Sequence, residues 1–149
     1  MSVHIRPARS TDAGAVGGIL SEFIDTTSWM PRLHSRAEDI GFAGHMIDQG
    51  WVEVAEQGGH VMGFAARDGS DVHALYIAAK ARRTGLGSAL LHKMQDQTDR
   101  LDLWTFQANL DAQAFYAAHG FREVTRTDGT RNDEGLPDIH LTWTKDAAP

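Results

Sequence analysis

Apolar residues recur along this chain with two different spacings, and the spacings predict an order of strands and helices. Short runs in which every second residue is apolar are typical of strands, whereas apolar residues three and four positions apart are typical of helices. Seven strands are expected near residues 3–8, 51–56, 60–67, 72–77, 101–107, 123–127 and 138–144. Four helices are expected near residues 13–23, 35–49, 86–94 and 112–118. The predicted order is strand, two helices, three strands, helix, strand, helix, two strands.

Turn and capping residues mark several of these boundaries. Ser10 or Thr11 is expected to be the N-cap of the first helix, and Ser35 with Glu38 three residues later matches the capping-box pattern of the second. The Asp-Gly pair at residues 68–69 is a strong hairpin signal. We therefore expect the three middle strands to be antiparallel neighbours.

This order predicts an α+β fold, with a mixed and mostly antiparallel sheet of about seven strands flanked by four helices. The strands at 72–77 and 101–107 are joined through a helix, so they must be parallel, with a right-handed connection. A chain of 149 residues fits one domain over 1–149, with its core at about 3–144. Trp104, Phe106 and Trp143 are expected to pack in that core.

Composition narrows the class of protein. The chain has no cysteine, which excludes disulfides and thiolate chemistry, and no apolar run as long as a membrane span, so a soluble cytoplasmic protein without membrane contact is expected. The 20 acidic residues exceed the 14 Lys and Arg, giving a net charge of -6 that disfavours nucleic acid as a partner. The eight histidines show no recognised ligand spacing, so no metal is expected.

A basic glycine loop, Arg82-Arg83-Thr84-Gly85-Leu86-Gly87, separates the strand at 72–77 from the following helix. Glycines allow close approach to a ligand, and the first turn of a helix has unpaired N–H groups, so such a loop can bind an anion such as phosphate. Lys80 and the two arginines would be unfavourable beside the positive helix end unless a polyanion binds there. The alternative is a solvated basic loop.

Familiar nucleotide motifs do not fit this loop, because a G-x-G-x-x-G motif would need a glycine at Leu90 and no P-loop motif is present. The pattern R-x-x-G-x-G after a strand instead resembles the pyrophosphate loop of the GNAT superfamily of acyl-CoA N-acyltransferases. The segment from Asn109 through Phe115-Tyr116 to Gly120-Phe121 is similar to a second signature of that superfamily. The resemblance implies a GNAT-like sheet in which one parallel strand pair splays apart.

The resemblance also implies that acetyl-CoA is the co-substrate and that a splayed strand offers its main chain to the pantetheine arm, as an added strand would. Tyr116 is assigned to protonate the departing thiolate. Asn109 either borders the pantetheine arm or simply caps a helix. The cofactor-binding residues implied are Leu75, Tyr76, Ile77, Arg82, Arg83, Thr84, Gly85, Leu86, Gly87, Ser88, Asn109 and Tyr116.

The sequence and the resemblance constrain the choice of the general base less than that of the general acid. His73 and Asp71 lie on the central strand and match catalytic positions of some N-acetyltransferases, and imidazole titrates in the useful range. The alternatives are a structural histidine and a solvated hairpin end. Glu53 and Glu22 are weaker candidates, and a chain of water molecules without a single base is a further alternative.

The segment between the first two helices is variable in such proteins and sets acceptor specificity. Here Trp29, Met30, Arg32 and His34 are the candidate substrate-binding residues, although the two apolar ones could instead plug the core. We expect direct transfer of an acetyl group to a small-molecule or peptide amine in a ternary complex. The alternative is a non-catalytic acyl-CoA-binding module. Relatives are often dimers, so a homodimer is a candidate assembly.

Overall fold

The computed structural model describes residues 3–146, which form one seven-stranded sheet and four α-helices in the predicted order. Short 3-10 helices, η1 (Ser10–Asp12) and η2 (Ala79–Ala81), precede α1 and the basic loop. The strands are β1 (Val3–Pro7), β2 (Val52–Gln57), β3 (His60–Asp68), β4 (Asp71–Ile77), β5 (Arg100–Phe106), β6 (Arg122–Thr127) and β7 (Asp138–Thr144). The helices are α1 (Ala13–Thr26), α2 (Arg36–Asp48), α3 (Leu86–Gln97) and α4 (Leu110–Ala118). The α+β prediction is confirmed.

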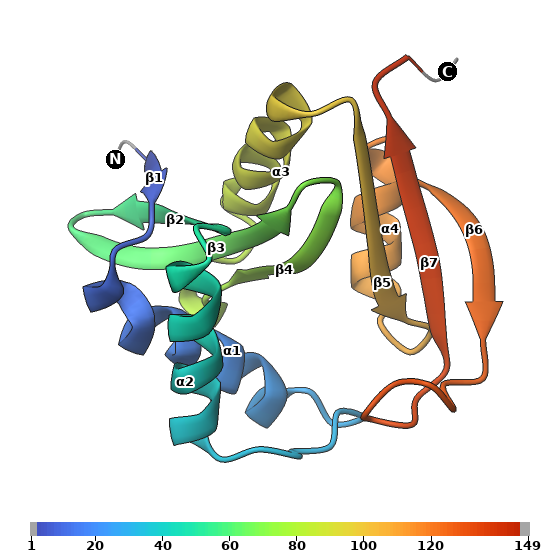
Figure 1. Cartoon of the computed structure of the whole chain (residues 1–149), viewed down its shortest axis with the longest axis horizontal. Helices are drawn as coiled ribbons and strands as arrows, with labels where there is room; N and C mark the ends of the chain where they lie inside the picture. Colours follow the sequence, from blue (N-terminus) through green and yellow to red (C-terminus); the bar gives the residue numbers. More distant parts are fainter. Residues whose placement is uncertain (1–2, 147–149) are drawn as a thin grey trace.

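The sheet has the strand order β1-β2-β3-β4-β5-β7-β6, and β4 and β5 are its parallel pair. These two strands share a single register pair, Asp71 with Asp102, beside which the Asp102 amide donates to the Ser70 carbonyl at 2.8 Å. Beyond this point they diverge (Figure 1), which confirms the splayed pair. In the described chain, the rest of β4 therefore has no strand partner on the side toward β5.

Two hydrophobic cores lie on opposite faces of the sheet. One joins α1 and α2 to β2, β3 and β4, and the other joins α3 and α4 to β5 and β7. Figure 1 shows α4 against one face of β5 and β7 and no described helix against the other. The fully buried large side chains include Phe64, Met46, Leu86, Leu90, Leu91, Leu101, Ile139, Val16 and Val54.

The first helix begins differently from the prediction. Neither Ser10 nor Thr11 is its N-cap: Arg9 precedes η1, and Asp12 precedes α1. The Asp12 carboxylate accepts from the Arg9 amide at 2.7 Å and pairs with the Arg6 guanidinium at 2.8 Å. The Asp12 carboxylate therefore takes the place of the expected hydroxyl. It caps the short 3-10 turn and also pairs with Arg6 of β1.

The second helix begins as predicted. Ser35 Oγ accepts from the Glu38 amide at 3.1 Å, and Glu38 accepts from the Ser35 amide at 2.9 Å. The helix crosses α1 closely, because a Cβ at Gly17 would lie 2.6 Å from the Ile40 Cα. Ile40 and Phe42 of this helix are 41% and 50% exposed, so these two apolar residues do not pack in the core.

The tryptophans of the last strands differ in burial. Leu101 and Leu103 point into the core beneath α3 and α4, so the alternate residue Trp104 points to the uncovered face and is 55% exposed. The prediction that Trp104 packs in the core is wrong. Trp143 packs against the core as predicted, whereas Phe106 is half-buried.

Candidate active site

The basic loop is held in an uncommon backbone conformation before α3. Gly85 is the N-cap of α3 with φ of 88°, and Arg83 has φ of 63°, the one non-glycine residue in the described chain with a positive φ. The Thr84 hydroxyl donates to the Ala81 carbonyl at 2.5 Å, which ties the loop back to η2. Glycine accepts this conformation without the steric cost that other residues incur.

Six consecutive amides are left available by this conformation. In residues 3–146, none of the N–H groups of Arg83, Thr84, Gly85, Leu86, Gly87 and Ser88 donates to a protein acceptor. The positive end of the α3 dipole and the arginines at 82 and 83 lie at the same place. This combination of free donors and positive charge is an anion site.

The second signature segment packs α4 against the start of α3. A Cβ at Gly87 would lie 3.4 Å from the Phe115 ring, so glycine permits this close approach. Asn109 is the N-cap of α4, and its side chain accepts from the Ala112 amide at 3.0 Å. Asn109 also lines the cavity described next, so the two alternatives for this residue are compatible.

A cavity of about 510 Å³ opens between the end of α1, β4, the loop and α4. It brings together Tyr116, residues 75–77 at the end of β4 and Gly87 at the start of α3. Its lining residues are Phe23, Thr26, Thr27, Ser28, Trp29, Leu75, Tyr76, Ile77, Arg82, Gly87, Asn109, Asp111, Ala112, Phe115 and Tyr116.

Two phenols line this cavity, that of the buried Tyr116 and that of the partly buried Tyr76. Burial raises the pKa of Tyr116, and the neighbouring Tyr76 adds to the effect. Burial, followed by the negative charge of Glu134, raises the pKa of Tyr76 to about 12. Both phenols therefore stay protonated near neutral pH and can donate a proton or a hydrogen bond.

His73 and Asp71 are not brought together as a pair in the cavity. Ala66 pairs with Ala74 but Arg67 pairs with Val72, so His73 is an extra residue in a β-bulge. The bulge breaks the regular alternation of side chains along β4, so His73 and Asp71 do not share one face of the strand as residues two positions apart otherwise would. The His73 ring stacks on Trp51 at 4.7 Å between centroids.

His73 nevertheless lines a small cavity of about 80 Å³ between β4 and β5, which Tyr116 also lines. Asp71 is exposed and lies at the closed end of the splayed pair, beside its register partner Asp102. A role for His73 therefore stays a prediction, and the geometry gives Asp71 no support.

The two weaker base candidates have structural partners. Glu22 accepts from the Ala79 amide at 2.7 Å and so holds η2 against α1. Glu53 pairs with Lys93 at 2.6 Å and accepts from Gln97 at 3.1 Å. Glu53 lies against α3 in this arrangement and does not line the cavity that contains Tyr116.

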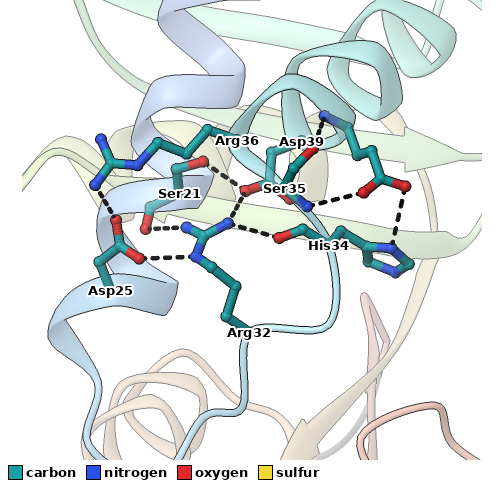
Figure 2. A network of polar contacts seen from close by, with 8 residues as sticks. Ser21, Asp25, Arg32, His34, Ser35, Arg36 and Asp39 are labelled. Carbon is teal, nitrogen blue, oxygen red and sulfur yellow. Dashed lines mark hydrogen bonds and ion pairs between the residues drawn. The ribbon is translucent and has the colours of Figure 1, made fainter.

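Arg32, predicted to meet the substrate, is engaged within the segment that joins α1 to α2 (Figure 2). Its guanidinium donates to Asp25 at 2.8 Å and to Asp39 at 3.0 Å. It also donates to the main-chain carbonyls of His34 at 2.8 Å and Ser21 at 3.2 Å. These bonds occupy the guanidinium, and Arg32 does not line the cavity that contains Tyr116.

The same network is closed by neighbouring groups. The Ser21 hydroxyl donates to Asp39 at 2.5 Å, and Arg36 donates to Asp25 at 2.6 Å. His34 is exposed and lies 3.8 Å from Glu38, away from the cavity. Of the four predicted acceptor residues, only Trp29 lines the cavity, and Met30 does not.

On the side of the α1–α2 segment, aromatic side chains form the wall of the cavity that contains Tyr116. Phe23 lies 4.9 Å from Tyr76 and 6.3 Å from Trp29, measured between ring centroids. Trp29 in turn lies 5.8 Å from Phe106 on β5. This wall joins the cavity to the uncovered face of β5.

A second cavity, of about 440 Å³, lies beyond Phe106. Sequence reasoning missed it, although the alternation of leucines with Trp104 and Phe106 along β5 indicates which residues leave the core. Its lining residues are Trp104, Thr105, Phe106, Thr127, Arg131, Asn132, Glu134 and Asp138. Trp104 stacks on His140 at 5.1 Å, and His140 Nε2 donates to Asp102 at 2.9 Å.

Two negative findings concern residues 3–146. No group of three or more His, Asp or Glu side chains there is arranged to hold a metal ion. No helix in that range is both long and apolar enough to cross a membrane.

Solved structures share this fold. Apo-form YjaB from Escherichia coli superimposes with a TM-score of 0.80 at 22% identity, covering 96% of this chain and 98% of YjaB. YncA from Salmonella typhimurium, solved with its cofactor acetyl-CoA, gives a TM-score of 0.75 at 20% identity, covering 100% of this chain and 98% of yncA. At these identities the likeness shows the fold alone, which is that of the acetyltransferases.

Sequence comparison identifies the family. The family model of the GNAT acetyltransferase domain matches residues 33–145, so the chain belongs to the GNAT acetyltransferase family. The peptidyl-lysine N-acetyltransferase YiaC of Escherichia coli K12 is 36% identical over 97 residues, which are 64% of this chain. The match spans 63% of the length of YiaC.

Proposed function

We propose that this protein is an acetyl-CoA-dependent N-acetyltransferase that transfers an acetyl group to a primary amine by direct attack in a ternary complex. One observation carries the proposal: Gly87, which belongs to the run of six free amides at residues 83–88, lines the same cavity as the buried Tyr116 phenol and residues 75–77 of β4, whose main chain has no strand partner toward β5. Family membership supports the same reaction class.

The loop and β4 would bind acetyl-CoA along its length. The amides of residues 83–88 would bind the pyrophosphate, because they are free donors at a positive helix end. The main chain of residues 75–77 would hydrogen-bond the pantetheine amides in place of a strand partner. This arrangement would direct the thioester toward Tyr116.

The chemistry requires two proton movements. The amine must lose a proton before it attacks the thioester carbonyl, and the coenzyme A thiolate must gain one when the tetrahedral intermediate collapses. The raised pKa of Tyr116 keeps its phenol protonated and ready to supply the second proton. No cysteine is present to form a thioester-linked acyl-enzyme, which is consistent with direct transfer.

A lysine side chain is the acceptor that we propose to test first. YiaC is by name a peptidyl-lysine N-acetyltransferase. The aromatic wall of Trp29, Phe106 and Trp104 offers apolar surface for the aliphatic stem of lysine. The Glu134 carboxylate, whose field reaches Tyr76, offers negative charge to the ammonium before deprotonation.

The decisive experiment measures thiol release from acetyl-CoA in the presence of lysine-containing peptides and a panel of small amines. We expect turnover with at least one lysine peptide. Tyr116→Phe should lower kcat by roughly 10²-fold while leaving the KM for acetyl-CoA near its original value, because only the proton donor is removed.

Tyr76→Phe is the matched variant, since Tyr76 is the other of the two tyrosines, and a smaller loss of kcat is expected. Coenzyme A binding without thiol release across the whole panel would contradict the proposed reaction. An unchanged kcat in Tyr116→Phe would remove this phenol from the mechanism. A covalent acetyl-enzyme trapped by mass spectrometry would exclude direct transfer.

A further inference from the structure

Ser88 and His119 form a hydrogen-bonded pair at the edge of the anion site. Ser88 lies in the first turn of α3, and its own amide is one of the six free donors. Its hydroxyl lies 3.0 Å from Nε2 of His119, the residue that follows α4. The other ring nitrogen, Nδ1, lies 2.7 Å from the Phe115 carbonyl oxygen.

The partner of Nδ1 fixes the direction of both bonds. The Phe115 carbonyl can only accept, so Nδ1 carries a hydrogen in either charge state of the ring. In neutral His119 the Nε2 atom is therefore an acceptor, and the Ser88 hydroxyl must donate to it. In protonated His119 both nitrogens donate, so the Ser88 hydroxyl accepts from Nε2 and its own hydrogen is free.

We propose that His119 is a positioning residue for the Ser88 hydroxyl. When His119 is protonated, this hydroxyl can donate a hydrogen bond to the pyrophosphate of acetyl-CoA, and when His119 is neutral it cannot. The inference rests on the proposed function, because it needs the pyrophosphate at residues 83–88. With neutral His119, the oxygen of Ser88 presents lone pairs to the phosphate. With protonated His119, it presents a hydrogen, and the ring adds a positive charge behind it.

Binding of coenzyme A is therefore coupled to uptake of one proton by His119. The affinity gained from this bond is present while His119 is protonated, and it is lost as the pH rises and the ring loses its proton. Affinity is lost as the pH rises because the polyanion favours the protonated ring of His119. The logarithm of the association constant should fall with pH, with a slope approaching about one.

The surroundings of His119 are compatible with this exchange. His92, one turn after Ser88 on α3, is the titratable group in ring contact, at 5.3 Å between centroids. The Phe115 ring on α4 lies 4.4 Å from the imidazole, and Gln95 of α3 donates to the main-chain carbonyl of His119 at 3.1 Å, so both helices contact this residue. Other ionisable groups nearby in the chain are the loop arginines at 82 and 83, Tyr116 on α4 and Arg122 at the start of β6.

The test is a calorimetric titration of the whole protein with coenzyme A, in pairs of buffers that differ in ionisation enthalpy, across the imidazole range. The wild-type protein should take up a proton on binding. Ser88→Ala and His119→Gln should each lose this uptake, and near the acidic end each should bind roughly tenfold more weakly, as expected for one charge-assisted hydrogen bond. In the double variant the losses should not add.

Controls separate the coupling from other causes. His92→Asn should keep the proton uptake, which distinguishes the two histidines. The 3′-phosphate of coenzyme A also titrates in this range, but its contribution is common to all variants. Pantetheine, which lacks the pyrophosphate, should bind the wild-type protein and Ser88→Ala equally.

Each other outcome has a definite meaning. Proton uptake that persists in Ser88→Ala and in His119→Gln would overturn the coupling and leave the proposed function intact. If proton uptake were lost only in His92→Asn, the ring that takes up the proton would be that of His92 and not that of His119, which would also overturn the inference. Absence of coenzyme A binding to the wild-type protein would contradict the proposed function itself.

Discussion

The two sides of the cleft are built in different ways. The side proposed to bind acetyl-CoA, called the donor side below, consists of the basic loop and α4, and several of its contacts join residues close in sequence, such as Thr84 to the Ala81 carbonyl and Asn109 to the Ala112 amide. The side proposed to bind the amine, called the acceptor side below, is made by the segment between α1 and α2, β5 and the loop after β6. Its contacts join distant residues, such as Trp29 with Phe106 and the Glu134 charge with Tyr76.

This difference indicates which properties can change independently. The donor side depends mainly on backbone amides and on glycine conformations, with Tyr116 and the Ser88–His119 pair as the side chains to which a role is proposed. The acceptor side depends on ion pairs and aromatic contacts, such as those of Arg32 and Trp29, which single substitutions can rearrange. Under the proposed function, we therefore expect that acceptor specificity can change while acetyl-CoA binding stays the same.

Arg32→Gln should have the largest effect on the acceptor side. It leaves the Asp39 carboxylate, whose side chain is 5% exposed, without its charged partner. We expect a loss of about 2–3 kcal/mol in the free energy of unfolding, because a buried charge is left unpaired. The KM for the acceptor should rise with little change in the KM for acetyl-CoA.

Chemical denaturation and steady-state kinetics would measure these effects, and Arg36→Gln is the matched control. Arg36 pairs with Asp25, but its side chain is 75% exposed, so less than about 0.5 kcal/mol should be lost. Equal losses in the two variants would mean that burial of Asp39 does not set the strength of the network. A rise in the KM for acetyl-CoA would show that the two sides are not independent.

The same difference explains what the sequence could predict. The element order, the splayed pair and the loop follow from local patterns and motifs. The bulge at His73 could not be predicted, because the register between β3 and β4 depends on the whole sheet. The hydrogen bonds of Arg32 could not be predicted, because its partners Asp25 and Asp39 lie on different helices, and the exposure of Trp104 could not, because it depends on the absence of a helix over its face in residues 3–146.

Asp102→Asn tests the bond between Asp102 and His140, the residue on which the exposed Trp104 stacks. Arg100 and then His140 lower the pKa of Asp102 to about 2, through bonds of 2.7 and 2.9 Å. Since the pKa in the folded protein is depressed, the stabilisation is present above about pH 4 and is lost as the pH falls toward about 2. Near neutral pH the variant should be less stable by about 1–2 kcal/mol.

Urea denaturation at about pH 7 and about pH 3 would measure this difference, which should shrink at the lower pH. Glu123→Gln removes an exposed ion pair with Arg126 on β6 and should change the stability by less than about 0.5 kcal/mol. A pH-independent gap between wild type and Asp102→Asn would mean that packing, and not charge, is lost. The KM for acetyl-CoA should stay unchanged in both variants.

Gly85→Ala should have the smallest effect on stability but act on the donor side alone. Gly85 has φ of 88° with open space around a Cβ, and Gly59 in the turn between β2 and β3 has φ of 79° with equally open space. Each alanine should therefore destabilise the fold by about 1 kcal/mol through backbone strain. Only Gly85→Ala should raise the KM for acetyl-CoA, because relief of strain at that residue reorients the free amides around it.

If Gly59→Ala raised this KM equally, general destabilisation would explain the effect. If Gly85→Ala instead raised the KM for the acceptor, the division of the cleft into a backbone-built donor side and a side-chain-built acceptor side would fail.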